Sequence, residues 1–131
     1  MSIQRFEDIQ AWQEARMLTC HVYAITREGA FSRDFGLRDQ IRRAAVSVMA
    51  NIAEGFDRRS NKEFVQFLGV AFASSSEVKS HLYVALDQSY IQQEKFDVAY
   101  AQCTKTASLI YGFMKYLSKN PNHHSSPSIE P

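Results

Sequence analysis

Apolar side chains return every three or four residues in four separate stretches of the chain. This spacing lines them up on one face of an α-helix, which turns once in about 3.6 residues. The stretches cover approximately residues 7–28, 37–56, 60–86 and 93–117. No segment alternates apolar and polar residues convincingly, as a half-buried strand would. The pattern therefore predicts an all-α protein of four long helices.

Several residues mark where these helices begin and end. Gly29 follows the first stretch, and glycine commonly terminates a helix because it adopts left-handed backbone without strain. Gly55 lies near the end of the second stretch, where we expect it to turn the chain. Ser60 and Glu63 form a capping box, in which each side chain accepts a hydrogen bond from the other residue's backbone N–H. Short loops between long helices favour an antiparallel up-and-down four-helix bundle.

The length of 131 residues fits one domain, and no proline occurs before Pro121, as long helices require. We expect a helical domain over residues 1–119 and a disordered polar tail over residues 120–131. His123 and His124 form an isolated pair in this tail, which we interpret as inert and not as a metal site.

The predicted helices carry more apolar residues than one core stripe needs. In the last stretch the core stripe comprises Phe96, Ala99, Tyr100, Cys103, Ala107, Ile110, Tyr111, Met114 and Leu117. The surplus residues of the last three stretches are Val46, Met49, Ala53, Val65, Val70, Phe72, Tyr83, Val84, Val98, Leu109, Phe113 and Tyr116. Apolar patches of this extent usually mark a partner surface, and self-association with cyclic symmetry is the simplest explanation. A monomer with tilted helices and ordinary surface hydrophobes is the alternative.

The formal net charge is only +1, so no global field attracts nucleic acid or a membrane. Between positions 33 and 62, however, seven basic residues accompany four acidic ones. The candidate nucleic-acid ligands in this window are Arg38, Arg42, Arg58, Arg59 and Lys62. Guanidinium groups suit phosphate, and a ring of copies would repeat the cluster. Pairing within the chain is the alternative: Asp39 with Arg43, and Glu54 or Asp57 with a neighbouring arginine.

Patterns that indicate catalysis are weak. Arg16 and His21 match the Arg-x4-His spacing of helical-bundle (HEPN-type) ribonucleases, but on a regular helix they lie about 140° apart. Glu77 and His81 are four residues apart, which indicates a surface ion pair and not a metal site. We therefore expect no enzyme, no cofactor and no metal, with a ribonuclease as the weakest alternative.

The two cysteines, Cys20 and Cys103, lie among apolar neighbours, which predicts buried free thiols in a reducing compartment. No apolar run reaches the ~20 residues that a membrane span needs. The first eight residues are polar and mixed in charge, unlike a signal peptide. We expect a cytoplasmic protein without membrane contact.

The segments QIRRAAVS (40–47) and NIAEG (51–55) resemble the bacterial four helix bundle proteins, also called the 23S rRNA intervening-sequence protein family. The likeness covers about residues 6–117. It implies an up-and-down bundle that assembles as a homopentameric ring. The chain is also similar, more distantly, to the accessory variability protein of diversity-generating retroelements, a basic pentamer that engages nucleic acid and a reverse transcriptase.

The resemblance implies no catalytic residue, and we interpret its shared positions as structural. These are Asn51, Glu54, Gly55, Ser60 and Glu63, with Asn51, Glu54 and Arg59 stitching the corner between the second and third helices. Many relatives carry proline at the Met49 position, so this second helix is expected to be straighter. Two hypotheses follow. The chain is a ring-forming scaffold that binds RNA, DNA or a ribonucleoprotein partner, or it is a protein-interaction module without nucleic-acid binding.

Overall fold

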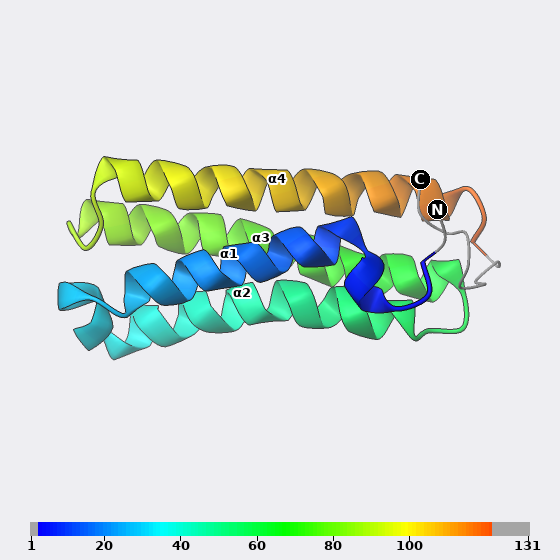
Figure 1. The fold of residues 1–131 in the computed structure, drawn as a ribbon, viewed down its shortest axis with the longest axis horizontal. Coiled ribbons are helices and arrows are strands. Elements are labelled where there is room, and N and C mark those ends of the chain that lie inside the picture. Colours follow the sequence, from blue (N-terminus) through cyan, green and yellow to red (C-terminus); the bar gives the residue numbers. More distant parts are fainter. Residues whose placement is uncertain (1–2, 122–131) are drawn as a thin grey trace.

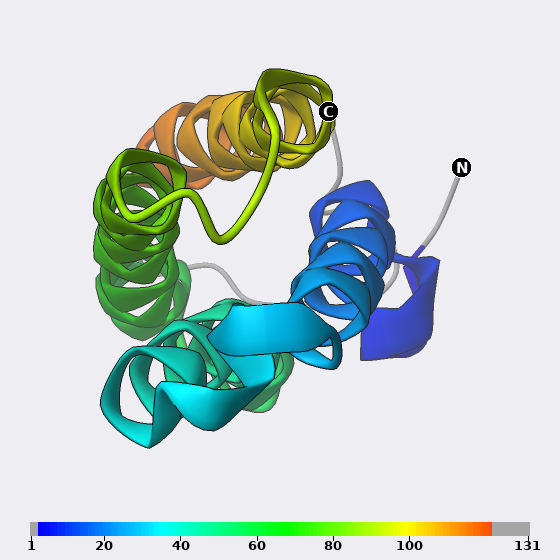
Figure 2. The ribbon, with the colours of Figure 1, turned by 90° about the vertical axis from the view of Figure 1, so that its left-hand side faces the viewer.

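The computed structural model describes residues 3–121, in which four long helices run antiparallel along one axis (Figure 1). They are α1 (Gln10–Thr26), α2 (Phe35–Phe56), α3 (Asn61–Asp87) and α4 (Gln93–Ser118). Two short 3-10 helices, η1 (Phe6–Asp8) and η2 (Gly29–Arg33), precede α1 and α2. Residues 3–121 contain no strand. Seen from one end, each helix packs on two neighbours, in the cyclic order α1, α2, α3, α4 (Figure 2). The prediction of an all-α helical bundle is confirmed.

The start of the bundle differs from the sequence prediction. The first helix begins at Gln10 and not near residue 7, because the chain makes a 3-10 turn before it. Ile3 and Ile9, on either side of η1, are fully buried, so this turn folds back on the core. The first helix ends at Thr26, three residues before Gly29, which instead begins η2 with φ +56°, in the left-handed region that glycine favours. The predicted loop after it contains η2, and the Asp34 carboxylate caps α2 by accepting from the Leu37 N–H at 3.1 Å.

The core consists of two apolar clusters along the bundle axis. One is centred on Ile52, Phe64 and Leu117 near the α2–α3 connection, and the other on Leu18, Ile41 and Leu82. Most residues of the predicted stripes are buried in these clusters, so the 3.6-residue period located the core faces of all four helices.

Two side chains of the fourth helix lie on the opposite side from the one predicted. Tyr111, predicted to be core, is 54% exposed, whereas Phe113, predicted to be surplus surface, is 4% exposed. Phe113 packs edge-on against Phe64 of α3 with ring centroids 5.3 Å apart. The buried line of α4 runs through Ile110, Phe113 and Leu117, and it turns Tyr111 outward. Phe113 is therefore unavailable for contact between copies.

The surplus apolar residues divide into two sets. Met49, Val65, Leu109 and Tyr116 pack against the Ile52 cluster. The surplus residues that remain exposed are Val46, Val70, Phe72, Tyr83, Val84 and Val98, and three further large apolar side chains, Met17, Phe35 and Tyr111, are exposed as well. The single chain thus buries part of the predicted surplus and leaves the rest open.

Gly55 does not turn the chain, contrary to the prediction. It lies buried within the last turn of α2, where α3 approaches closely. A Cβ at this position would lie 2.6 Å from Cδ1 of Phe64 and 2.9 Å from Cβ of Phe67. The absence of a side chain at Gly55 therefore lets the two helices meet. As expected without proline at the Met49 position, α2 is a single helix from Phe35 to Phe56.

The capping box forms with one changed partner. The Ser60 hydroxyl accepts from the Glu63 N–H at 3.1 Å, but the Glu63 carboxylate accepts from the Arg59 N–H at 3.3 Å instead of from Ser60. The chain after α4 also binds here. The Pro121 carbonyl accepts from the Lys62 N–H at 2.7 Å, and the Asn120 carbonyl accepts from the Asn61 side chain at 2.9 Å.

The first two residues of the predicted tail, Asn120 and Pro121, are therefore attached to α3 and are not free. The rest of the predicted disordered tail, with His123 and His124, lies outside the described residues. Within residues 3–121, no group of three or more His, Cys, Asp or Glu side chains could hold a metal ion. None of the described helices is long and apolar enough to cross a membrane.

The two cysteines are free thiols in different environments. Cys103 is buried, as predicted; its thiol donates to the Ser75 carbonyl at 3.0 Å, and burial raises its pKa to about 11. Cys20 is exposed, contrary to the prediction, because Leu18 and Val22 occupy the core side of this stretch of α1.

Candidate nucleic-acid interface

The five candidate basic residues do not form one surface. Arg38 and Arg42 lie near the start of α2, whereas Arg58, Arg59 and Lys62 surround the connection between α2 and α3. Twenty helical residues span about 30 Å at 1.5 Å per residue. The two groups therefore lie at opposite ends of the bundle.

The Arg38 guanidinium is held by the η2–α2 connection. Its Nε donates to the Asp39 carboxylate at 2.9 Å, and its Nη1 donates to the Ser32 carbonyl at 3.1 Å. It also lies over the Phe35 ring, 4.7 Å from the centroid. The predicted pairing of Asp39 with Arg43 is wrong, because Arg38 takes this carboxylate; Arg43 is exposed.

Arg42 connects α2 to the end of α1. Its Nε donates to the Thr26 hydroxyl at 2.8 Å, and its guanidinium lies 4.5 Å from the centroid of the Tyr23 ring. Thr26 is fully buried, and its hydroxyl in turn donates to the Val22 carbonyl at 2.7 Å. The cation also lies near the carbonyl end of α1, where the helix dipole favours positive charge. The fold thus uses Arg42 to fix one helix to the next.

Arg58 is more open. Its Nε donates to the Glu54 carbonyl at 3.3 Å, and its Nη2 lies 3.9 Å from the Glu54 carboxylate, as the predicted pairing of Glu54 with an arginine requires. Its guanidinium carbon lies 4.5 Å from the centroid of the Phe67 ring on α3. The side chain is 43% exposed, against 26% for Arg38. Phe67 therefore presents the cation at the surface.

Arg59 and Lys62 are exposed at the same corner of the bundle. Within residues 3–121, neither charged group takes part in an ion pair or a side-chain hydrogen bond. Only their backbone N–H groups are used, by Glu63 and Pro121 respectively. These two cations are thus available to an anionic ligand.

Lys119 was missed by sequence reasoning and joins this corner. The backbone bonds from Asn61 and Lys62 to Asn120 and Pro121 bring the end of α4 against the start of α3. Lys119, exposed, immediately precedes these residues. A basic residue next to the last helix was the available signal, but its partners are distant in sequence.

We define the basic corner as Arg58, Arg59, Lys62 and Lys119. Glu54, Asp57 and Glu63 are acidic residues of the same connection and offset part of its charge. Glu54 faces Arg58, and Glu63 is engaged by a backbone N–H. The cations nevertheless outnumber the carboxylates, and Arg59 and Lys62 remain unpaired within the described chain.

Asn51 does not stitch the corner, contrary to the prediction. Its side-chain amide donates to the carbonyl and to the hydroxyl of Ser47, one turn earlier on α2, at 2.8 and 3.0 Å. The Ser47 hydroxyl lies 2.9 Å from the hydroxyl of Ser74, which α3 buries. This polar bridge joins α2 to α3 at mid-height in the bundle.

Comparison with known proteins places this fold. Residues 7–112 match the family model described as 23S rRNA-intervening sequence protein. The chain belongs to this family. Its sequence resemblance to the 23S rRNA-intervening sequence proteins is thereby confirmed, whereas the more distant likeness to the accessory variability protein stays a prediction. No curated protein matches the chain.

A solved structure from Bacteroides thetaiotaomicron, described as a protein with unknown function from the S23 ribosomal protein family, has the same fold. It aligns with a TM-score of 0.73 at 21% identity, covering 80% of this chain and 98% of that chain. At this identity the likeness shows the fold alone. The match to the 23S rRNA-intervening sequence proteins includes Arg58, Arg59 and Lys62 but ends before Lys119.

Arg16 and His21, the residues of the ribonuclease alternative, have separate contacts in the structure. Arg16 rests on the Trp12 ring, 5.8 Å from its centroid. His21 borders a groove of about 460 Å³ between α1 and α4. Both residues also border a shallow hollow along α1, but no hydrogen bond joins them within the described chain. A ribonuclease role for Arg16 and His21 therefore stays a prediction.

Proposed function

We propose that this 23S rRNA-intervening sequence family member is a non-enzymatic helical scaffold that binds nucleic acid at the basic corner and assembles with copies of itself. The observation that carries the first half is the pair of exposed cations, Arg59 and Lys62, with Lys119 beside them. Guanidinium and ammonium groups bind phosphate, and each neutralised phosphate releases counterions. The ribosomal RNA term in the family's name supports RNA as the first probe.

Of the five candidate basic residues, Arg58, Arg59 and Lys62 are retained, and Lys119 is added. Arg38 and Arg42 are set aside, because Arg38 is bonded to Asp39 and to the Ser32 carbonyl of η2, and Arg42 is bonded to Thr26 of α1. A corner with few cations gives weak binding in one copy, so several copies on one RNA are needed for high affinity.

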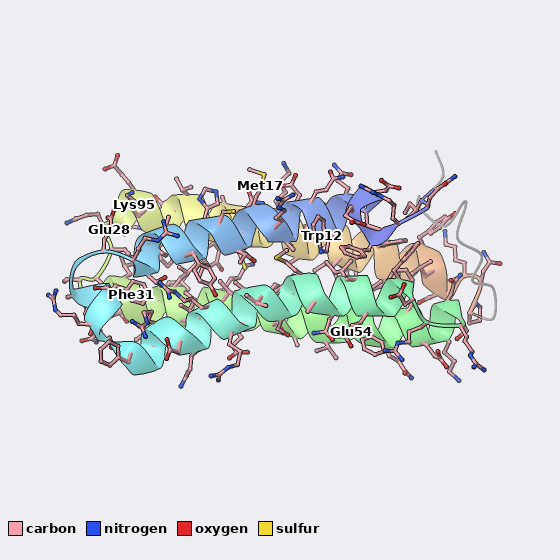
Figure 3. The ribbon with its side chains drawn as sticks, turned by 60° about the horizontal axis from the view of Figure 1, so that its bottom comes forward. Trp12, Met17, Glu28, Phe31, Glu54 and Lys95 are labelled. Carbon is pink, nitrogen blue, oxygen red and sulfur yellow. The ribbon has the colours of Figure 1, made fainter. Side chains whose placement is uncertain are left out.

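The assembly half of the proposal is a homopentameric ring, as the family resemblance implies. Met17 and Val98 are exposed on α1 and α4, and Val98 borders the groove between these helices. Figure 3 shows Met17 pointing away from the bundle, on the opposite side of α1 from Trp12. Burying a large apolar side chain stabilises by about 1.5–3 kcal/mol. We assign the α1–α4 groove to the contact between copies, with a different face of the next copy filling it, as a ring requires.

Charge reversal at the corner tests the nucleic-acid half. Arg59→Glu with Lys62→Glu should weaken binding of a labelled structured RNA at least about tenfold at about 50 mM salt, because two phosphate contacts become repulsive. Fluorescence anisotropy measures this change. The matched control is Arg27→Glu with Arg33→Glu, two exposed arginines near the opposite end. Equal loss in the control, or no binding by the unaltered protein, would remove nucleic acid from the proposal. A protein-interaction module would then be the remaining function.

Mass measurement tests the assembly half. Light scattering should give about five times the chain mass, and Met17→Asp with Val98→Asp should reduce it to a single chain, because the contact between copies on this side of α1 and α4 would then bury carboxylates. Val46→Asp with Val70→Asp, at exposed apolar positions elsewhere, is the control and should leave the mass unchanged. A single-chain mass for the unaltered protein at micromolar concentration contradicts the ring.

A further inference from the structure

The outer face between α3 and α4 carries aromatic side chains that neither the core nor the basic corner uses. Phe72 and Tyr83 of α3 and Tyr111 of α4 are 37–54% exposed. Phe72 and Tyr111 lie 6.1 Å apart between ring centroids, and Tyr83 lies 5.8 Å from Tyr100. We call this line of rings the aromatic groove. Tyrosine and phenylalanine faces left open in this way are stacking surfaces.

A hollow of about 340 Å³ lies within the aromatic groove. Phe72 and Lys79 border it from α3, and Thr104, Ser108 and Tyr111 border it from α4. The hollow is therefore lined by aromatic rings, a lysine and two hydroxyl groups, so its lining is partly polar.

Two lysines lie over the rings of the aromatic groove. Lys79 lies over the Tyr100 ring with Nζ 4.8 Å from the centroid, and Lys115 lies over Tyr111 at 5.6 Å. Within the described chain, neither lysine forms an ion pair. Ammonium groups that no carboxylate neutralises favour an anionic ligand.

Acidic residues are absent from most of this face. On α3 no acidic residue lies between Glu63 and Glu77, and on α4 none follows Asp97. Glu77 pairs with His81 at 3.3 Å and lies about 140° round the helix from Phe72. Lys105 faces the other way, toward Glu14 of α1 at 3.5 Å.

The aromatic groove continues from the basic corner. Lys115 precedes Lys119 by one helical turn, and Lys119 lies beside the start of α3. From Lys119 to Tyr100 the helix rises about 28 Å. Cations and rings thus alternate along one path from the corner toward the far end of the bundle.

We propose that the aromatic groove takes a single strand of RNA or DNA, with unpaired bases on Phe72, Tyr83 and Tyr111 and phosphates at Lys79 and Lys115. This inference rests on the proposed nucleic-acid binding and specifies the form of the ligand. Base faces in a duplex are covered by neighbouring base pairs, so exposed rings reach only unpaired bases. The positive charge and the continuity with the basic corner favour a polyanion over a second copy of this chain.

The test compares a 12-nucleotide oligouridine with an RNA duplex of equal length. Phe72→Leu with Tyr111→Leu keeps apolar area but removes two stacking faces, and it should weaken single-strand binding about tenfold or more while duplex binding is unchanged. Lys79→Gln with Lys115→Gln should lower the salt slope of single-strand binding by about 0.7 per lysine. Phe35→Leu, an exposed ring at the start of α2, is the matched control and should change neither.

The outcomes separate this inference from the proposed function. If the groove variants bind the single strand like the unaltered protein, while the corner variant loses all binding, the inference is wrong and the proposed function stands. If Phe72→Leu with Tyr111→Leu lowers the mass of the assembly, the groove is a contact between copies, and the inference is overturned. No binding of either RNA by the unaltered protein overturns both.

Discussion

Arginines lie near both ends of α2, but they are bonded to neighbouring segments at its start and exposed to solvent beyond its end. At its start, Arg38 and Arg42 donate to Asp39, to the Ser32 carbonyl and to the buried Thr26 hydroxyl. At its end, Arg58 is half exposed over Phe67, and Arg59 and Lys62 extend unpaired from the corner. Acceptors from α1 and η2 bind the first pair, whereas residues 3–121 offer none to the charged groups of Arg59 and Lys62. The surrounding acceptors, and not the arginine itself, decide between a structural and a binding role.

The basic corner also combines exposed cationic side chains with a backbone that is held in place. Gly55 allows α3 to approach α2, and the residues after α4 are attached to Asn61 and Lys62. The backbone that carries the cations is therefore fixed, although the charged groups of Arg59 and Lys62 are unpaired within residues 3–121. The corner therefore combines a fixed backbone with exposed cations, whereas the opposite end of α2 is a joint between helices.

The largest expected effect comes from breaking the helix approach at the corner. Gly55→Val should lower the free energy of unfolding by about 3 kcal/mol, because its Cβ would overlap the Phe64 ring and the added methyl groups have no space. Denaturant titration measures this change. Gly112→Val, at a helix position with open space, is the control and should be within about 0.5 kcal/mol of the unaltered protein. Equal effects at the two glycines would show that close approach at Gly55 does not matter.

A smaller effect sharpens the contrast between the two arginine groups. Arg42→Ala should cost about 1.5 kcal/mol, because it removes a charge-assisted bond to Thr26 and a ring contact with Tyr23. Arg59→Ala should change stability by less than about 0.5 kcal/mol, because its guanidinium holds nothing in the described chain. Thermal unfolding followed by circular dichroism, together with RNA affinity, should give opposite rankings for the two variants. A stability loss at Arg59 as large as that at Arg42 would contradict the comparison.

Local pattern was sufficient to predict the four helices and most of the core. The 3.6-residue period of apolar side chains depends on neighbours within one helix, and so does the cap at Ser60. The pairing of Glu77 with His81 and that of Glu54 with Arg58 were predictable for the same reason, since both join residues four apart in the sequence. These features need no knowledge of how the helices pack.

The errors share a different cause. Tyr111 and Phe113 were assigned to the wrong sides of α4, and Cys20 was placed in the core, because a helix pattern gives angles but not the arc that a neighbouring helix covers. The role of Gly55 depends on Phe64, and Lys119 reaches the corner only through bonds to α3. Each of these positions is decided by a contact with another helix.

By itself, then, the sequence determined that the chain is a bundle of four long helices and a member of its family, because amphipathic periodicity and a local motif are written in consecutive residues. Only the tertiary structure decided which arginines bond to neighbouring segments and which cations stay exposed. It also decided which aromatic rings line an outer groove. The physical reason is that hydrogen-bond acceptors and covering side chains come from segments far apart along the chain, so the availability of a charge or a ring exists only after packing.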